Sequence, residues 1–317
     1  MADSDAIAPN ASPSLTERGH LLTEQSNPHS ANLDQLSTLE LVALFHQEDK
    51  RAVEAMAAIQ VELAAAIDRT ADALRQGGRL IYIGAGTSGR LGVLDAAECP
   101  PTFCTPPEMV QGILAGGRDA LVRSSEGLED RAEDGAAAIA QLDIGDRDMV
   151  VGITAGGTTP YVHGALHEAK QRGATTIFLA CVPANQVSID VDIDLRILVG
   201  PEILAGSTRL KAGTVTKLAL NTLSTGVMVK LGKVYGNRMV DVAVTNQKLH
   251  DRALRILQDL TGLNRTEAGV LLDQSDRHVK QALLMHWTGL DSETTQAMLA
   301  MHHGNLRQAL LAVSDSH

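Results

Sequence analysis

The stretch "IYIGAGTSGRLGVLDAAE", residues 81–98, predicts how the central part of this chain folds. Its apolar start is typical of a buried strand, its glycines predict a tight turn, and the remainder is typical of the helix that follows. Residues 147–173, "RDMVVGITAGGTTPYVHGALHEAKQRG", repeat this order of strand, Gly/Thr loop and helix. Strands that alternate with helices favour parallel βαβ units, so we expect an α/β fold with a doubly wound, mainly parallel sheet.

Further elements extend this pattern on both sides. Apolar residues at three- and four-residue spacing predict one long helix or two consecutive helices from Ser37, the expected N-cap, to Gly77 and Gly78. We expect a mostly helical stretch over 117–142 and a long apolar helix over 211–234. Further strands are predicted at 108–117, 174–183 and 195–200.

Composition divides the chain into three parts. Residues 1–14 are rich in Ala, Ser, Pro and Asp, which predicts a disordered tail. Residues 15–240 hold the N-terminal helices and the α/β pattern, and we expect them to form one domain. Residues 241–317 lack strand-like runs and predict a small helical subdomain.

Charge and composition exclude several classes of function. The 317 residues carry 27 Lys and Arg against 38 Asp and Glu, and this net charge of −11 argues against a nucleic-acid partner. Aromatic residues make up 2%, so any sugar must be held mainly by hydrogen bonds. The three cysteines form no CxxC pair, and no signal peptide or membrane span is apparent. We therefore expect a cytoplasmic protein with no membrane partner.

The first glycine loop matches a nucleotide-binding pattern only in part. Gly84, Gly86 and Gly89 fit G-x-G-x-x-G, but the next strand ends in glycines where a dinucleotide site needs an acidic residue. A second interpretation is that backbone N–H groups at the helix start, with Thr87 and Ser88, hold a phosphate or sugar hydroxyls. A third is a tight turn with no ligand, capped by a hydroxyl.

Two later loops favour the binding interpretation. "TAGGTTP", residues 154–160, and "GSTRLKAGT", residues 206–214, also follow predicted strands. The second adds Arg209 and Lys211, which are either surface charges or, as favoured in such a loop, cations that bind an anion. Loops at the carboxyl ends of parallel strands meet at one edge, so we expect all three to converge on one crevice. Glu202 either orients a sugar or caps a turn. The predicted substrate-binding residues are Gly86, Thr87, Ser88, Gly89, Gly156, Gly157, Thr158, Thr159, Glu202, Ser207, Thr208 and Lys211.

Two carboxylates follow the first loop, three residues apart. Asp95 and Glu98 are expected on one helix face. Glu98 is either a solvated helix residue or part of a shared, partly dry site, which would raise one pKa as a general acid requires. Pro100 and Pro101 predict a chain turn directly after Glu98. Cys99 is interpreted as buried structure. Acidic residues over 126–134 and the histidines 163 and 167 are interpreted mainly as solvated helix surface.

These segments resemble a known family over most of the chain, from about Leu22 to Leu310. The chain is similar to the N-acetylmuramic acid 6-phosphate etherases, which have the SIS (sugar isomerase) fold. The similar blocks occur in the same order as in that family; they are residues 22–42, 80–103, 114–117, 126–131, 150–162 and 200–242.

The resemblance implies an activity and a site. It implies a cytoplasmic enzyme of cell-wall recycling that cleaves a D-lactyl ether to N-acetylglucosamine 6-phosphate and D-lactate, with no metal, nucleotide or other cofactor. It also implies a homodimer with sites near the subunit interface, and an SIS sugar-phosphate-binding domain over 15–240. By motif, Glu98 in "DAAECPP" corresponds to the catalytic acid and Glu129 in "EGLED" to a second acid/base residue, the expected C2 base.

One loop departs from the family, and two other functions stay open. Members commonly have Ser-Gly-Arg-Thr-Pro where this chain has Gly156-Gly157-Thr158-Thr159-Pro160, so a hydroxyl and a guanidinium are missing.

Vertebrate regulatory proteins that resemble the family sense sugar phosphates and bind a kinase without catalysis, and the helical tail would suit such a partner. A sugar-phosphate isomerase shares the C2 proton abstraction but does not explain the block-by-block match.

Overall fold

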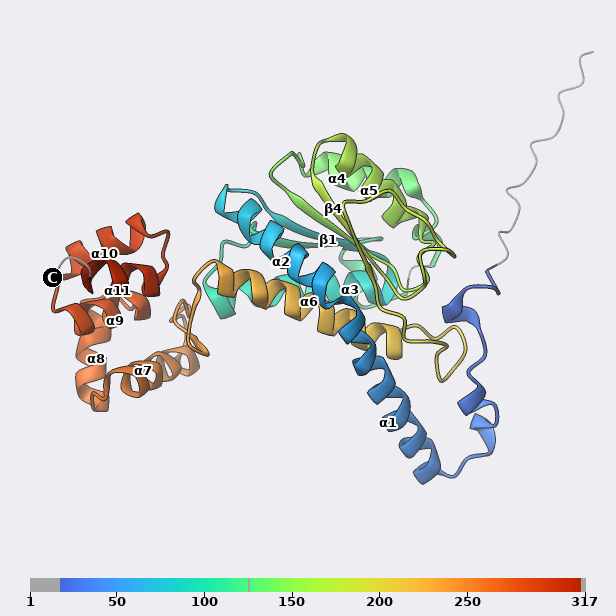
Figure 1. The fold of residues 1–317 in the computed structure, drawn as a ribbon, viewed down its shortest axis with the longest axis horizontal. Helices are drawn as coiled ribbons and strands as arrows, with labels where there is room; N and C mark the ends of the chain where they lie inside the picture. The colour runs from blue at the N-terminus through green and yellow to red at the C-terminus, as the bar shows by residue number, and fades with distance from the viewer. Residues whose placement is uncertain (1–17, 125, 315–317) are drawn as a thin grey trace, which may run out of the picture.

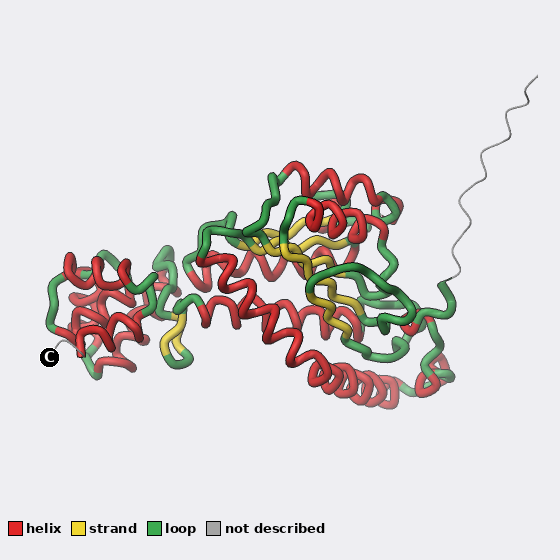
Figure 2. The backbone as a smooth tube through the Cα atoms, turned by 45° about the horizontal axis from the view of Figure 1, so that its top comes forward, coloured by secondary structure: helices red, strands yellow, loops and turns green. Residues whose placement is uncertain are grey.

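The computed structural model describes residues 18–124 and 126–314, so the tail expected at 1–14 lies outside the described residues. A sheet of five parallel strands forms its centre, in the order β2-β1-β3-β4-β5 (Figures 1 and 2). The strands are β1 (Leu80–Gly84), β2 (Val110–Leu114), β3 (Met149–Ile153), β4 (Thr175–Ala180) and β5 (Ile193–Arg196). The predicted α/β fold is confirmed, although β5 begins two residues before the predicted 195–200 run.

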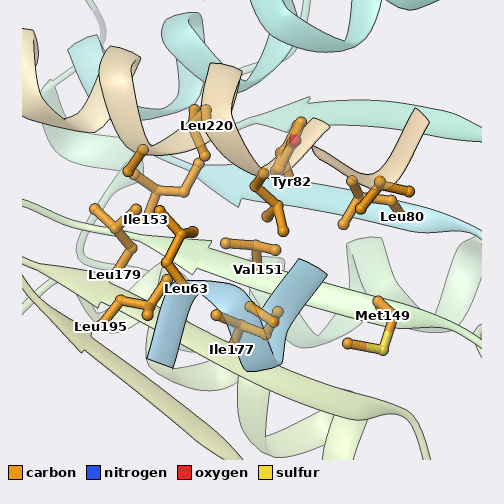
Figure 3. Packing of buried hydrophobic residues seen from close by; sticks show 14 of the residues in the cluster. Leu63, Leu80, Tyr82, Met149, Val151, Ile153, Ile177, Leu179, Leu195 and Leu220 are labelled. Carbon is orange, nitrogen blue, oxygen red and sulfur yellow. The ribbon is translucent and has the colours of Figure 1, made fainter. Parts of the chain in front are cut away.

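Helices cover both faces of this sheet. One face packs against α2 (Gln60–Arg75), α3 (Gly86–Phe103) and α6 (Lys211–Lys230), and Figure 3 shows Leu63 of α2 and Leu220 of α6 against the strands. The other face packs against α4 (Ala132–Gln141) and α5 (Pro160–Gln171). The strands β1 and β3 are therefore buried on both sides, as their unbroken apolar runs predict.

Ahead of the sheet, the predicted N-terminal helical segment is divided in two. Ser37 caps α1 (Thr38–Glu54) through a capping box with Glu40, as predicted. A 3-10 turn, η4 (Ala55–Ile59), separates α1 from α2. Two consecutive helices are therefore present rather than one.

Glycines allow α3 to lie close against its neighbouring strands. A Cβ built on Gly89 would lie 2.5 Å from the Gly84 carbonyl oxygen, and one built on Gly112 of β2 would lie 2.5 Å from Val93 Cα. Gly86 has open space around it but a φ of +53°, which favours glycine. A Cβ built on Gly84 would lie 2.8 Å from Gly89 N. In the G-x-G-x-x-G pattern, Gly84 and Gly89 thus serve helix packing, and Gly86 serves the turn.

The helix α3 does not end where its prolines predict. Pro100 and Pro101 lie inside it, and it continues to Phe103 and ends at Cys104, whose φ of 51° is left-handed. Proline has a φ that a helix accepts, and near the helix end its missing N–H removes few bonds. The predicted turn directly after Glu98 is therefore wrong.

Up to residue 314, where the described residues end, a hairpin and five helices follow α6. The hairpin of β6 (Val234–Tyr235) and β7 (Arg238–Met239) was not predicted from the sequence. The helices pack around a hydrophobic cluster of their own; they are α7 (Gln247–Thr261), α8 (Arg265–Gln274), α9 (Val279–Thr288), α10 (Ser292–Met301) and α11 (Leu306–Ser314). They lie beyond the end of α6, whereas the strand-end loops lie near its start (Figure 1). No helix in the described part of the chain is long and apolar enough to span a membrane.

Candidate functional site

The first loop (residues 84–90) and the third loop (residues 206–214) meet at one cavity. Its volume is about 310 Å³, and its lining residues come from the start of α3 and from the loop and first turns of α6; they are Thr87, Leu91, Arg209, Gly213, Thr214, Lys217 and Leu218. A Cβ built on Gly213 would lie 3.6 Å from Thr87 Cγ2, so the two helix starts are in close contact. The structure therefore brings the predicted Thr87 and Arg209 together.

This cavity suits an anion. Arg209 and Lys217 are exposed cations beside the N-termini of two helices, where partial positive charge gathers. Three hydroxyl residues next to these lining residues in the sequence are partly exposed: Ser88, which follows Thr87, and Ser207 and Thr208, which precede Arg209. Lys217 was not selected from the sequence. Its spacing could have indicated it, because Lys217 stands three residues after Thr214 on the same helix and the two side chains therefore lie on one helix face.

The second loop (residues 154–160) lines a different cavity. Its volume is about 490 Å³, and Thr158, Pro160 and His163 lie in its wall. His163 Nε2 lies 2.6 Å from the Gly157 carbonyl oxygen, and Thr159 Oγ1 lies 2.8 Å from Thr154 Oγ1. Within one chain, the three loops therefore line two cavities rather than the single crevice expected. His163, interpreted as solvated from the sequence, holds this loop.

An N-terminal 3-10 turn, η1 (Leu22–Glu24), lies between the second and third loops. A Cβ built on Gly156 would lie 3.5 Å from Thr23 Oγ1, and one built on Gly206 would lie 3.1 Å from Glu24 Oε2. Sequence reasoning did not select Thr23 or Glu24 as site residues, although both belong to the first block of the family resemblance. The turn therefore lies close to both loops.

Glu202 and Lys211 have structural contacts in place of the expected ligand contacts. The fully buried Glu202 carboxylate accepts hydrogen bonds from the backbone N–H of Lys211 (2.9 Å) and Ala212 (3.0 Å), so it caps α6. Of the two alternatives for Glu202, the cap is correct. Lys211 is 2% exposed and its ammonium lies 2.7 Å from Glu48 Oε2, so burial removes it from the anion site.

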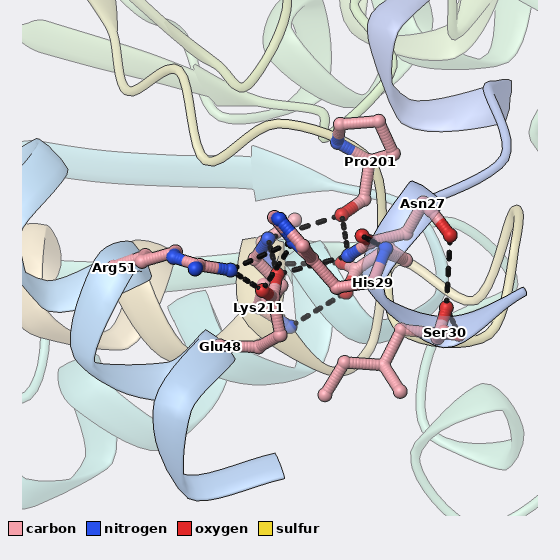
Figure 4. A network of polar contacts seen from close by, with 10 residues as sticks. Asn27, His29, Ser30, Glu48, Arg51, Pro201 and Lys211 are labelled. Atoms are coloured by element: carbon pink, nitrogen blue, oxygen red, sulfur yellow. Dashed lines mark hydrogen bonds and ion pairs between the residues drawn. The ribbon is translucent and has the colours of Figure 1, made fainter. Parts of the chain in front are cut away.

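Glu48 is the centre of a buried polar network (Figure 4). Its carboxylate accepts hydrogen bonds from Lys211 and from Asn27 Nδ2 (2.9 Å), and it also pairs with Arg51. Burial raises the pKa of Glu48, but the bonds from Lys211, Asn27 and Arg51 outweigh burial and bring that pKa to about 2. The network joins the N-terminal segment, α1 and the start of α6, and so it positions the third loop.

Asp95 and Glu98 do not share a site. Asp95 is buried and accepts hydrogen bonds from Tyr82 Oη (2.9 Å), Asn221 Nδ2 (2.5 Å) and Ser224 Oγ (3.1 Å). Burial and the charge of Asp95 raise the pKa of Tyr82. Glu98 is exposed on the outer surface of α3. The expected shared dry site is therefore wrong, because α3 turns Asp95 toward α6 and Glu98 toward solvent.

Cys99 and Glu129 complete the residues selected from the sequence. Cys99 is buried, and burial raises the pKa of its thiol to about 12, which agrees with a structural residue. Glu129 is half-buried, and its carbonyl oxygen accepts a hydrogen bond from Tyr161 N (3.0 Å) at the start of α5. Glu129 therefore lies beside the second loop, whereas Glu98 lies far along α3.

Comparison with known proteins identifies the family. The model of the glucokinase regulatory protein N-terminal SIS domain matches residues 62–170, and the SIS domain model matches 133–225. The model of the C-terminal lid domain of glucokinase regulatory protein matches residues 236–285. A solved phosphoheptose isomerase from Francisella tularensis is 20% identical with a TM-score of 0.48, over 61% of this chain and 100% of that one.

Two curated relatives are much closer in sequence. The N-acetylmuramic acid 6-phosphate etherase of Nostoc sp. PCC 7120 is 73% identical over 96% of this chain and 99% of its own length. The protein of the same name from Trichormus variabilis is 74% identical over 93% of this chain and 96% of its own length. This chain belongs to the N-acetylmuramic acid 6-phosphate etherase family. The resemblance inferred from the sequence blocks is thus confirmed.

In this etherase-family chain, the loop that departs from the common motif has room for the missing groups. A Cβ at Gly156 would make only an ordinary contact, 3.5 Å from Thr23 Oγ1. Thr158 is partly exposed in the cavity wall beside Pro160. Neither position is closed by packing, so the departure is not required by the fold of the loop.

Proposed function

We propose that this protein cleaves the D-lactyl ether of N-acetylmuramic acid 6-phosphate, giving N-acetylglucosamine 6-phosphate and D-lactate in amino-sugar catabolism. The observation that carries the proposal is the 73% identity to an etherase over 96% of the chain. The cavity between Thr87, Arg209 and Lys217 supports it, because two cations and two helix starts suit a phosphate.

The mechanism is an elimination followed by hydration. The Glu129 carboxylate removes the C2 proton of the open-chain aldehyde, and the aldehyde carbonyl takes the electron pair as an enolate. The enolate then expels the ether oxygen from C3, and the Glu98 carboxyl donates its proton to that oxygen so that lactate leaves with a neutral hydroxyl. Water adds across the new C2–C3 double bond, with hydroxyl at C3 and hydrogen at C2.

The loops would hold the sugar phosphate, and two of the expected contacts are revised. Direct contacts are proposed for the first loop, the second loop and the hydroxyls of the third, with Arg209 and Lys217 as cations. Glu202 and Lys211 would act by fixing the third loop. We also propose a cytoplasmic homodimer in which 15–240 is the sugar-phosphate-binding domain and 241–317 a helical subdomain.

Lactate release in deuterated water tests this function. Incubation with N-acetylmuramic acid 6-phosphate is expected to release D-lactate and to leave deuterium at C2 of the sugar product, because the C2 proton is exchanged during elimination. The lactate is measured enzymatically and the label by NMR. Binding of the sugar phosphate without any lactate would support a sensor instead, a role that the matches to glucokinase regulatory protein models make the second candidate.

The departure in the second loop leads to a prediction on substrate affinity. The double substitution Gly156→Ser with Thr158→Arg is expected to lower KM about tenfold, because it adds a hydroxyl and a charge-assisted bond to phosphate. The value of kcat should stay the same, since neither residue is a proton donor in the mechanism. Steady-state kinetics decide this, and the single Gly156→Ser variant separates the two contributions. An unchanged KM in the double variant would contradict the prediction.

A further inference from the structure

A charged cavity lies where the C-terminal helices meet the ends of α3 and α6. Its volume is about 260 Å³, and its wall includes Cys104 at the end of α3, Leu231 and Lys233 after α6, and residues of α9 and α10. The helix α6 has 20 residues and is about 30 Å long. The cavity lined by Arg209 and Lys217 lies at its start. The two cavities therefore lie at opposite ends of α6, which runs toward the C-terminal helices in Figure 1.

Two ammonium groups face one carboxylate in the wall of this cavity. Lys233 Nζ and Lys280 Nζ lie 2.9 Å and 2.7 Å from the same oxygen, Asp241 Oδ2. Among the wall residues, all of which belong to the described part of the chain, Asp241 is the only acidic one. With the histidines of the wall neutral, the three groups therefore leave one positive charge without a counter-charge.

This excess charge is costly because it is largely buried. The Lys280 side chain is 8% exposed, and burial lowers its pKa, an effect that Asp241 offsets in part and Lys233 reinforces. Each ammonium carries three N–H groups. Lys280 uses one for Asp241 and one for the Gly304 carbonyl oxygen, and Lys233 uses one for Asp241. Both lysines therefore keep N–H groups for an anion in the cavity.

The rest of the wall decides which anion fits. Apolar side chains make up much of it; they are Leu231, Val240, Val242, Val279 and Leu299. A cavity of about 150 Å³ accommodates a benzene ring, so about 260 Å³ is enough for a carboxylate with a body of several carbons. A monoanion neutralises the single excess charge, whereas a phosphate dianion would leave a negative charge against apolar walls.

We propose that this cavity binds a small organic monocarboxylate, with its carboxylate between Lys233 and Lys280 and its apolar body against the valines and leucines. Because the two lysines belong to the end of α6 and to α9, the ligand joins the C-terminal helices to the α/β domain. The proposal does not depend on the proposed function. D-lactate, a product of that reaction, is nevertheless a monocarboxylate and one possible source of the ligand.

Isothermal titration calorimetry of the full chain with sodium butyrate tests this site. Butyrate is expected to bind, whereas butyramide, which has the same shape and no charge, is not. Lys280→Met and Lys233→Met should each weaken butyrate binding about 10- to 100-fold, because each removes a charge-assisted hydrogen bond. Lys230→Met is the matched control and should bind as the wild type, since Lys230 ends α6 and pairs with Asp68 at the surface.

Two lysine variants keep the test valid if one of them fails to fold, which circular dichroism shows. Lys280→Met removes the more buried ammonium. Lys233 is 22% exposed, and Lys233→Met leaves Asp241 paired with Lys280. Loss of butyrate binding in a folded Lys233→Met variant is therefore sufficient to support the site.

Titrations with D-lactate and inorganic phosphate identify the source of the ligand. Lysine-dependent binding of D-lactate that is tighter than that of butyrate would support a product site, and the reverse order would support a monocarboxylate from another reaction. Phosphate that binds more tightly than either carboxylate would overturn the proposal, as would the absence of any binding. Butyrate binding that survives both lysine variants but is lost in Arg209→Glu with Lys217→Glu would place the carboxylate in the other cavity and also overturn it. Lactate release is not measured, so failure of the etherase activity leaves these outcomes unchanged.

Discussion

Glu98→Gln is expected to lower kcat for lactate release by a factor of about 10² to 10⁴, the range typical of a lost general acid. Glutamine keeps the shape of the side chain but has no acidic proton for the departing ether oxygen. Because Glu98 is exposed and its side chain makes no hydrogen bond or ion pair within the described residues, stability should change by less than about 0.5 kcal/mol. Steady-state kinetics and urea unfolding measure the two quantities.

Deuterium exchange separates the roles of the two carboxylates. The Glu98→Gln variant should still exchange the C2 proton, since the base is intact, whereas Glu129→Gln should lose both exchange and lactate release. Glu62→Gln, at another exposed helical position, is the matched control and should behave as the wild type. Wild-type lactate release by Glu98→Gln would refute the assignment of Glu98 as the acid.

Glu48→Gln is expected to lower the free energy of unfolding by about 3 to 5 kcal/mol, the usual cost of removing one partner of a buried ion pair. Lys211 is 2% exposed, and its ammonium would lose the carboxylate that lies 2.7 Å away. The third loop should also loosen, because Lys211 begins α6. Urea unfolding measures the change, and Asp72→Asn, which breaks the exposed pair with Arg75, should cost at most about 1 kcal/mol.

The pKa of Glu48 gives this effect a pH dependence. Its folded-state pKa is about 2, against about 4.3 for an unperturbed Glu in the unfolded chain. A depressed pKa contributes stability that is present above the unfolded value and is lost as pH falls through the folded value. The stability difference between wild type and Glu48→Gln should therefore narrow between about pH 4.3 and pH 2. A constant difference over this range would refute the assignment.

Local sequence patterns predicted most of the fold. The apolar run before Gly84 and its repeat before Thr154 predicted buried parallel strands, since a strand covered on both faces must be apolar throughout. Ser37 predicted the start of α1 because a capping box lies within four residues of chain. The position of β5 and the end of α3 were less accurate, because both depend on pairing and packing partners that are distant in the chain.

The sequence by itself determined the strand–loop–helix order, the family and the identity of the two candidate carboxylates, because these depend on neighbouring residues or on whole blocks of sequence. Only the tertiary structure decided which of the polar residues are buried in structural contacts and which are exposed. It buried Lys211 against Glu48, turned Glu202 into a cap, and set Asp95 inward and Glu98 outward on α3. These outcomes depend on which elements pack together, and a spacing of three residues along a helix does not encode that information.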